Sequence, residues 1–133
     1  MVFHLKKKKD SLIKIVNPKK NDLILDIGSN DGTLLNLFSN KFRRFGVDPT
    51  ARKFKKYYQK DIKIIPKIFD NNIFNKNKKF KLITAVAMFY DLRDPLNFFK
   101  NIENNLDKNG VFHVEIAYLP DIIKLFSFDT FCQ

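Results

Sequence analysis

Acidic residues and glycines share one short segment of the chain, LILDIGSNDGTLL, which runs from Leu23 to Leu35. An apolar run leads to Asp26 and a helical pattern begins at Thr33, which predicts a strand, a tight turn and a helix. In the turn, Gly28 and Gly32 permit backbone angles and close approaches that a side chain would block. The helix N-terminus offers unpaired N–H groups, and this edge of an α/β sheet usually holds a nucleotide-like ligand.

The spacing in this segment favours a ligand that carries positive charge. A dinucleotide-binding turn reads G-x-G-x-x-G, whereas this one reads Asp26-x-Gly28-x-Asn30-x-Gly32. A pyrophosphate favours a bare helix N-terminus, but acids such as Asp26 and Asp31 suit an ammonium or a sulfonium group. The segment resembles the D/E-x-G-x-G-x-G loop of class I S-adenosylmethionine-dependent methyltransferases, with Asn30 in place of the middle glycine. The alternative is an ordinary strand–helix turn in another α/β domain.

Two further positions follow predicted strands and point to the same edge of a sheet. Asp48, followed by Pro49, closes the second predicted strand about 20 residues after the glycine turn, where an acid commonly binds ribose hydroxyls. The other interpretation is that Asp48 only starts a turn before the proline. Phe69 follows the third predicted strand, and either flanks an adenine or belongs to the core.

Apolar runs that alternate with helical patterns predict a parallel sheet with right-handed crossovers, in an α/β, Rossmann-like three-layer sandwich. The predicted strands span residues 23–27, 44–47, 62–65, 80–87 and 111–116. The predicted helices span residues 33–40, 51–60 and 95–108, with a short one near 120–128 and a loop at 66–79. No repeat or linker divides the chain, so one domain is expected.

Capping residues and apolar spacing add detail to three of these helices. Thr50 is a candidate N-cap for the helix at 51–60, and Asp94 with Pro95 starts the next one. The spacing of apolar residues predicts the buried faces. In the helix from 95 these are Leu96, Phe99, Ile102 and Leu106, and in a helical lead-in at 1–18 they are Leu5, Leu12, Ile13 and Val16.

The overall composition is that of a folded and strongly basic protein. The 133 residues carry a formal charge of +11 and are 44% apolar, which excludes a disordered composition. The charge is compatible with an acidic partner such as RNA. However, lysines are scattered through every segment, and Asn, Ile and Phe are abundant too, which indicates a compositional bias. Nucleic-acid binding is therefore the less favoured interpretation.

The cysteine content and the absence of a signal-peptide pattern or a long apolar stretch in the sequence predict a cytoplasmic protein. One cysteine, Cys132, and two distant histidines, His4 and His113, exclude a disulfide framework and predict no metal site. The basic run at 6–9 is followed by Asp10 rather than by a long apolar segment, so no signal peptide is expected. No apolar stretch is long enough to span a membrane.

Several stretches together resemble the sugar C-methyltransferases, which methylate a ring carbon of nucleotide-linked deoxyhexoses. They are DIGSNDGTLL at 26–35, GVDP at 46–49, MFYD at 88–91, DKNGVF at 107–112, EIAYLP at 115–120 and FDT at 128–130. The resemblance covers residues 20–133 and implies the strand order 3-2-1-4-5, S-adenosylmethionine as cofactor and a nucleotide-sugar as substrate. It implies a cofactor-binding set of Asp26, Gly28, Ser29, Asn30, Gly32, Asp48, Pro49, Phe69, Ala87 and Met88.

Departures from the family pattern bear on catalysis. The zinc-binding N-terminal domain of the family has no counterpart here, and the His-Glu-His segment that supplies the family's base should follow the FDT stretch, where this chain ends. We therefore expect a methyltransferase domain at 19–133 that lacks the last two family strands, either a piece of a longer enzyme or a degenerate copy. Glu115 and Tyr118 are the weak catalytic candidates that remain. A non-catalytic cofactor-binding module and an RNA methyltransferase are the alternatives.

Overall fold

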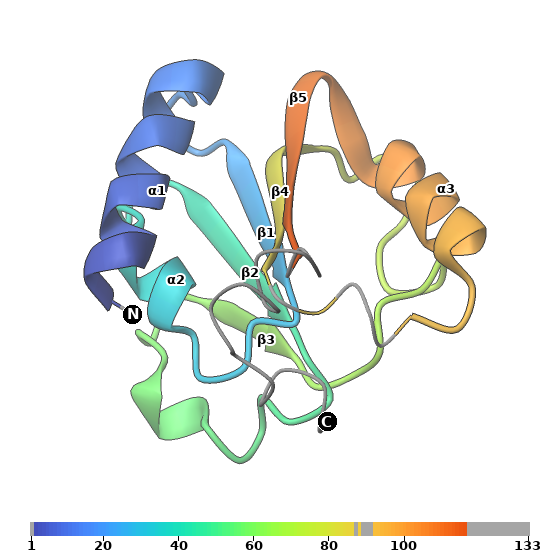
Figure 1. Ribbon diagram of the computed structural model, residues 1–133, viewed down its shortest axis with the longest axis horizontal. Coiled ribbons are helices and arrows are strands. Elements are labelled where there is room, and N and C mark those ends of the chain that lie inside the picture. The colour runs from blue at the N-terminus through green and yellow to red at the C-terminus, as the bar shows by residue number, and fades with distance from the viewer. Residues whose placement is uncertain (1, 87, 89–91, 117–133) are drawn as a thin grey trace, which may run out of the picture.

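A five-stranded, all-parallel sheet forms the centre of the protein (Figure 1). The computed structural model describes residues 2–86, 88 and 92–116. The strands are β1 (Leu23–Ile27), β2 (Arg43–Val47), β3 (Lys63–Ile65), β4 (Phe80–Val86) and β5 (Leu106–Glu115). Their order is β3-β2-β1-β4-β5, which confirms the predicted order and the α/β class.

Helices cover both faces of this sheet and make it the middle of three layers. Helices α1 (Val2–Val16) and α2 (Thr33–Leu37) lie on one face, and α3 (Pro95–Asn105) lies on the other (Figure 1). A short 3₁₀ helix, η1 (Lys55–Tyr57), precedes β3. Among the described residues, no helix has the length and apolar character needed to cross a membrane.

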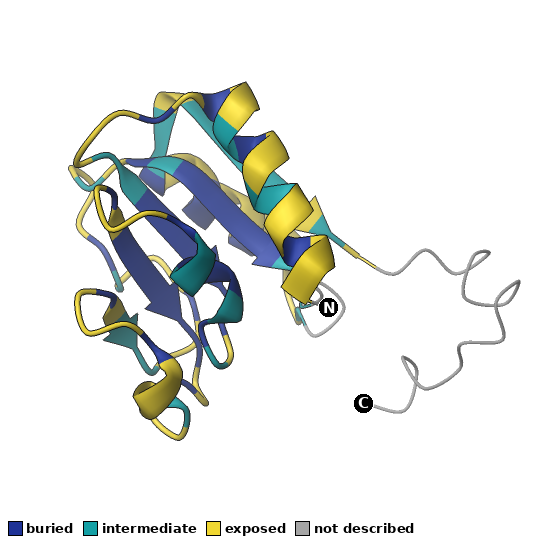
Figure 2. Ribbon diagram, turned by 90° about the vertical axis from the view of Figure 1, so that its left-hand side faces the viewer, coloured by how far each residue is buried: buried dark blue, intermediate teal, exposed yellow. Residues whose placement is uncertain are grey.

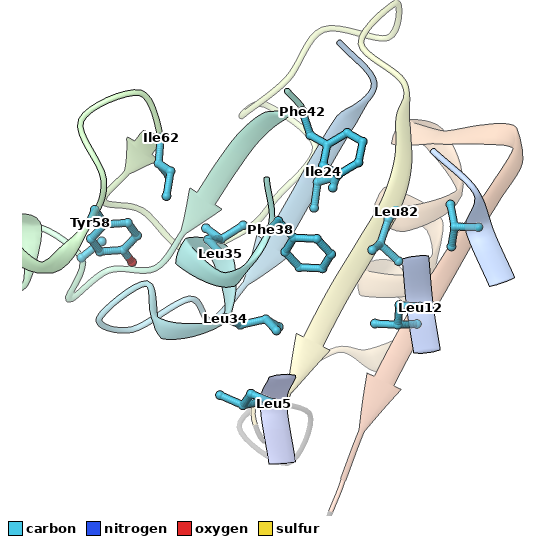
Figure 3. Close-up of a cluster of buried hydrophobic side chains, with 12 residues drawn as sticks. Leu5, Leu12, Ile24, Leu34, Leu35, Phe38, Phe42, Tyr58, Ile62 and Leu82 are labelled. Carbon is cyan, nitrogen blue, oxygen red and sulfur yellow. The ribbon is translucent and has the colours of Figure 1, made fainter. Parts of the chain in front are cut away.

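Two apolar clusters, one on each face of the sheet, form the core. On the α1–α2 face, Leu5 and Leu12 of α1 pack with Leu34 of α2 and Leu82 of β4 (Figure 3). On the α3 face, β1 and β4 pack against Phe98 and its neighbours. Figure 2 shows the result, with central strands buried and α1 buried on one side only. The predicted lead-in helix thus contributes Leu5, Leu12 and Val16 to the core.

The buried face of α3 differs from the predicted one. Its buried residues are Phe98, Asn101, Ile102 and Asn105, whereas Leu96 is 77% exposed. The prediction was wrong at Leu96 and Phe99, whereas Ile102 is buried and Leu106 packs partly buried against the core. The reason is that a mainly three-residue spacing drifts around a helix with 3.6 residues per turn. The observed set follows the i, i+3, i+4, i+7 pattern. A search for apolar residues does not find this pattern, because two of its four positions are asparagines. The predicted caps, Asp94 and Pro95, are confirmed.

One predicted helix and several predicted boundaries also differ. The predicted helix at 51–60 consists of turns and η1, and Thr50 donates hydrogen bonds to Asp48 instead of capping a helix. Helix α2 ends at Leu37, before the predicted position 40. Strand β5 begins at Leu106 rather than at 111, so residues 106–108, which were predicted to end α3, belong to the strand. Its pairing with β4 has an irregular register at this start. The short helix predicted near 120–128 lies outside the described residues.

Candidate functional site

The glycine turn lies at the carboxyl end of β1 and adopts left-handed backbone angles at three positions. Gly28, Asn30 and Gly32 have φ angles of 73°, 48° and 78°. Asparagine tolerates this conformation better than most residues, which explains how Asn30 stands at the position of the middle glycine. The N–H of Gly28 donates to the carbonyl of Val47 at 2.8 Å, so the turn is attached to the end of β2.

Close neighbours explain why both outer positions of the turn are glycine. A Cβ atom on Gly28 would lie 3.0 Å from the side chain of Met88. A Cβ atom on Gly32 would lie 2.6 Å from the ring of Tyr58, a separation that real side chains do not adopt. The turn is therefore packed between β4 and the segment before β3, and its conformation is fixed by these neighbours.

Tyr58 is a site residue that the sequence analysis missed. Its hydroxyl donates to the carbonyl of Asn30 at 2.7 Å and lies 2.8 Å from Oγ of Ser29. Because a hydroxyl has one hydrogen, Ser29 must be the donor in the second bond. Burial raises the pKa of Tyr58 to about 12, although the bond from Ser29 lowers it, so the hydroxyl stays protonated. Tyr58 lay inside a predicted helix, where no local signal marks such a contact.

We predict that replacing Tyr58 by phenylalanine weakens binding of S-adenosylhomocysteine about 3- to 10-fold. The loss of one neutral hydrogen bond to the turn costs roughly 0.5–1.5 kcal/mol, and the ring that packs under Gly32 is kept. Calorimetric titration measures the effect, with Tyr57→Phe as the control because Tyr57 is 55% exposed. Equal affinities of the two variants would contradict the role of the hydroxyl.

Asp48 lies at the carboxyl end of β2 and holds the turn in place. Its Oδ2 accepts from the N–H of Asn30 at 2.9 Å. Its Oδ1 accepts from the N–H and the hydroxyl of Thr50, at 2.7 and 2.6 Å. A carboxylate has about four acceptor positions, so one remains on Oδ2 beside the turn. The bonds to Thr50 correspond to the interpretation that Asp48 starts a turn before helix-free residues 50–54. Binding of a ribose hydroxyl by Asp48 stays a prediction.

Asp26 is buried beneath the same turn, next to Thr84 of β4. The two residues are register partners, and the hydroxyl of Thr84 donates to Oδ1 of Asp26 at 2.7 Å. Burial raises the pKa of Asp26 to about 7, while the bond from Thr84 lowers it and the charge of Asp48 raises it. Close to neutral pH this carboxyl is therefore partly protonated. Thr84 was missed because an apolar strand with one threonine does not mark the threonine as functional.

The acid Asp31 and the other predicted cofactor residues lie in different surroundings. Asp31 accepts from the N–H and the hydroxyl of Thr33, the first residue of α2. Phe69 is buried in the core on the α3 face, with its ring 5.7 Å from that of Phe98, which corresponds to the core interpretation. Met88 lies against Gly28. Ala87, another predicted cofactor residue, lies outside the described residues.

Glu115, one of the two catalytic candidates, is held by α1. It pairs in the sheet with Val86, the last residue of β4, and forms an ion pair with Lys8 and a hydrogen bond with His4, the latter at 3.3 Å. Burial raises the pKa of Glu115, but the hydrogen bonds from Lys8 and His4 outweigh it, so the pKa is lowered. The other candidate, Tyr118, lies outside the described residues. Within the described part of the chain, no group of three His, Cys, Asp or Glu residues could hold a metal.

Comparison with known proteins identifies the family. The model of a methyltransferase domain family matches residues 4–125. The chain belongs to this family. The predicted class I methyltransferase relationship is thereby confirmed, and with it S-adenosylmethionine as the cofactor of the class.

Individual relatives of this methyltransferase domain are distant. The chain is 26% identical over 135 residues to the C-methyltransferase NovU of Streptomyces niveus, covering 98% of this chain and 32% of NovU. It is 25% identical to a tRNA U34 carboxymethyltransferase of Campylobacter lari, covering 77% of this chain and 38% of that protein. The plantazolicin methyltransferase BpumL, solved in complex with SAH, matches with a TM-score of 0.76 at 16% identity, covering 93% of this chain and 49% of BpumL. The chain thus spans a third to a half of these relatives.

Proposed function

We propose that this domain binds S-adenosylmethionine over the glycine turn and that the intact protein methylates a ring carbon of a nucleotide-linked keto-deoxysugar. The observation that carries the cofactor part is the arrangement at the ends of β1 and β2. There a glycine turn with left-handed backbone angles and two buried carboxyls, Asp26 and Asp48, meet at one edge of the sheet. The similarity to NovU supports the C-methyl part.

The residues at this edge fit the chemistry of the cofactor. A ligand with an ammonium and a sulfonium group favours nearby acids, and Asp26, Asp31 and Asp48 lie in or beside the turn. A close approach to the backbone requires the absence of side chains, and the turn has Gly28 and Gly32 at the tightest positions. Oδ2 of Asp48 retains one acceptor for a ribose hydroxyl. When bound, the cofactor supplies an electrophilic methyl group.

The proposed roles follow from these positions. Asp26, Gly28, Ser29, Asn30 and Gly32 form the base of the cofactor site. Asp48, with Pro49, orients the ribose, and Ala87 and Met88 line the site after β4. Phe69 supports this edge from the core, and any contact of Phe69 with an adenine stays a prediction.

Methylation of a carbon next to a keto group requires removal of a proton, and the base must lie within hydrogen-bond reach of that proton. Glu115 is ion-paired with Lys8 and has a lowered pKa, which makes it a poor base for a carbon acid. We therefore assign Glu115 a role in orienting substrate and α1, and we leave Tyr118 as the second candidate. The cytoplasmic location stays a prediction.

The second candidate function is methylation of RNA. It is favoured by the formal charge of +11 and by the similarity to a tRNA-modifying relative. Methyl transfer from labelled cofactor to a keto-deoxysugar nucleotide, and not to RNA, by the full-length protein would support the first function. Transfer to RNA that falls steeply with salt would support the second. Cofactor binding without transfer to either would indicate a non-catalytic binding module.

We predict that Asp48→Ala weakens binding of S-adenosylhomocysteine about 10- to 100-fold. The variant removes charge-assisted hydrogen bonds worth roughly 1.5–3 kcal/mol, both to the ligand and to the turn at Asn30. Calorimetry measures the change. Asp107→Ala is the matched control, because its carboxylate accepts from the N–H of Asn109 at the opposite end of the strands, far from the turn. Unchanged affinity in Asp48→Ala would mean that the ribose is held elsewhere.

A further inference from the structure

Three cations gather at the edge of the sheet opposite the glycine turn. Arg43 and Lys63 are the first residues of β2 and β3, and Lys78 lies two residues before β4. In a parallel sheet the starts of neighbouring strands share one edge, so these residues converge there. The glycine turn follows the end of β1, so the cation cluster is separated from the turn by the length of a strand.

Direct contacts bring two of the three cations, Lys63 and Lys78, together over one aromatic ring. The ammonium of Lys78 lies 4.6 Å from the ring centroid of Phe45, and that of Lys63 lies 5.7 Å from the same centroid. Phe45 and Lys63 are register partners, so their side chains share the α3 face of the sheet. Phe45 itself is 3% exposed, so the two ammonium groups lie over a buried ring.

The three positive charges of this arrangement repel one another. Burial lowers the pKa of Lys78, and the charges of Lys63 and Arg43 lower it further. Within residues 2–86, 88 and 92–116, none of the three cations forms an ion pair with a carboxylate. A contact with one ring accounts for one covered lysine, but not for three like charges in one place. An anion bound between them would relieve the repulsion.

A cavity of about 350 Å³ adjoins the cation cluster. It is lined by Asn71, Asn72, Phe74, Lys76, Asn104 and Asn105. Lys78 also lies 5.9 Å from the ring centroid of Phe74, so this ring borders both the cavity and the cluster. The amide of Asn105 donates to the carbonyls of Asn75 and Lys78 at 3.2 and 3.0 Å, which fixes the cavity wall to the cluster.

The lining of this cavity indicates the chemical class of its ligand. Side-chain amides both donate and accept hydrogen bonds, so they suit hydroxyl groups and the edges of bases. The lining includes a cation, Lys76, and no acid, and the volume is at the lower end of the range for small-ligand sites. A phosphate would lie near the cluster and a polar, ring-containing group would lie in the cavity, which together describe a nucleotide.

We propose that Arg43, Lys63 and Lys78, with the adjoining asparagine-lined cavity, form a phosphate-binding site for a nucleotide, separate from the methyl-donor turn. This site goes beyond the proposed function, because a ligand at the starts of the strands is about a strand length from the turn. The ligand is either a free nucleotide or one nucleotide of an RNA chain, since both present the same phosphate and ribose.

The test compares two double variants that remove equal charge. Lys63→Met with Lys78→Met removes both ammonium groups and keeps the apolar stems over Phe45. Lys6→Met with Lys14→Met is the matched control, because both lysines are exposed on α1 on the other face of the sheet. The probes are UDP, titrated by calorimetry, and a fluorescent oligouridylate of about 12 nucleotides, titrated by anisotropy.

We expect at least one probe to bind, and the Lys63/Lys78 variant to bind it about 10- to 100-fold more weakly than the control variant. The slope of log affinity against log salt concentration, measured with oligouridylate, should become shallower by about one for each phosphate that the variant no longer binds. Binding of UDP would identify a free nucleotide as the ligand, and binding of the oligomer without UDP would identify an RNA chain. Asn104→Ala, on the cavity wall, should weaken the same probe without a change in thermal stability.

Two results would overturn the proposal. One is the absence of binding by both probes. The other is an equal loss of affinity in the two double variants, which would show attraction to the overall charge alone. Affinity for S-adenosylhomocysteine, measured on the same samples, reports separately on the glycine turn, so failure of either site is distinguishable from failure of the other.

Discussion

Replacing Asp26 by asparagine is expected to remove a pH dependence of stability of roughly 4 kcal/mol. Burial raises the pKa of Asp26 from 3.8 to about 7. The folded protein therefore binds this proton more tightly than the unfolded chain does, and stability falls as pH rises from about 4 to about 7. Each pKa unit corresponds to about 1.4 kcal/mol, so the full cost of ionisation is present above pH 7 and absent below pH 4.

Urea unfolding across pH 4 to 8 measures this effect as a difference between variant and parent. The free energy of unfolding of Asp26→Asn, relative to the parent, should increase by roughly 4 kcal/mol over this range, whatever constant cost the amide introduces. In a second variant, Thr84→Val, the fall in stability should extend to higher pH, because the bond from Thr84 lowers the pKa of Asp26 in the folded protein. A difference that does not change with pH would show that Asp26 is ionised throughout.

The second large effect is expected at Arg44, which is 1% exposed. Its guanidinium donates to the carbonyls of Leu35 and Phe38, at 3.1 and 2.7 Å, and so satisfies the end of α2. It also donates to Gln59 at 2.8 Å and to Asp61 at 2.6 Å. Arg44→Ala should lower the free energy of unfolding by about 3–5 kcal/mol, because it leaves buried carbonyls unpaired and opens a cavity.

Matched variants separate the contributions at Arg44. Arg44→Met keeps most of the side-chain volume. The difference in unfolding free energy between Arg44→Met and Arg44→Ala therefore measures the cost of the cavity. Asp61→Asn should cost less than about 1 kcal/mol, because the side chain of Asp61 is 51% exposed and its ion pair is screened by water. Urea unfolding at pH 7 measures all three variants. If Arg44→Ala lost as little unfolding free energy as Asp61→Asn, the guanidinium would not be what holds the end of α2 in place.

Arg44 also connects stability to the candidate site. It holds the end of α2, and α2 begins directly after the glycine turn. Loosening α2 should therefore weaken S-adenosylhomocysteine binding in Arg44→Met even where the protein stays folded. The strand interpretation of residue 44 was correct, but nothing in the sequence indicated that a charged residue at the start of a strand would be buried.

Local features of this chain were determined by the sequence itself. The bounds of β1, the glycine turn and the Asp94–Pro95 start of α3 were predicted correctly, because each depends on the backbone preferences of a few adjacent residues. The sheet order followed from the family resemblance, and the matching family model confirms the coarser part of that resemblance, a methyltransferase domain. Asp48 was also placed correctly at the end of β2.

The tertiary structure alone decided how distant residues meet. Tyr58 reaches the glycine turn from 28 residues away, Thr84 reaches Asp26 across the sheet, and α1 brings His4 to Glu115. It also decided the electrostatics, because the pKa of Asp26 depends on burial by segments that lie far from it in the sequence. Such contacts depend on packing and register between elements, and neither is encoded in the spacing of residues within one element.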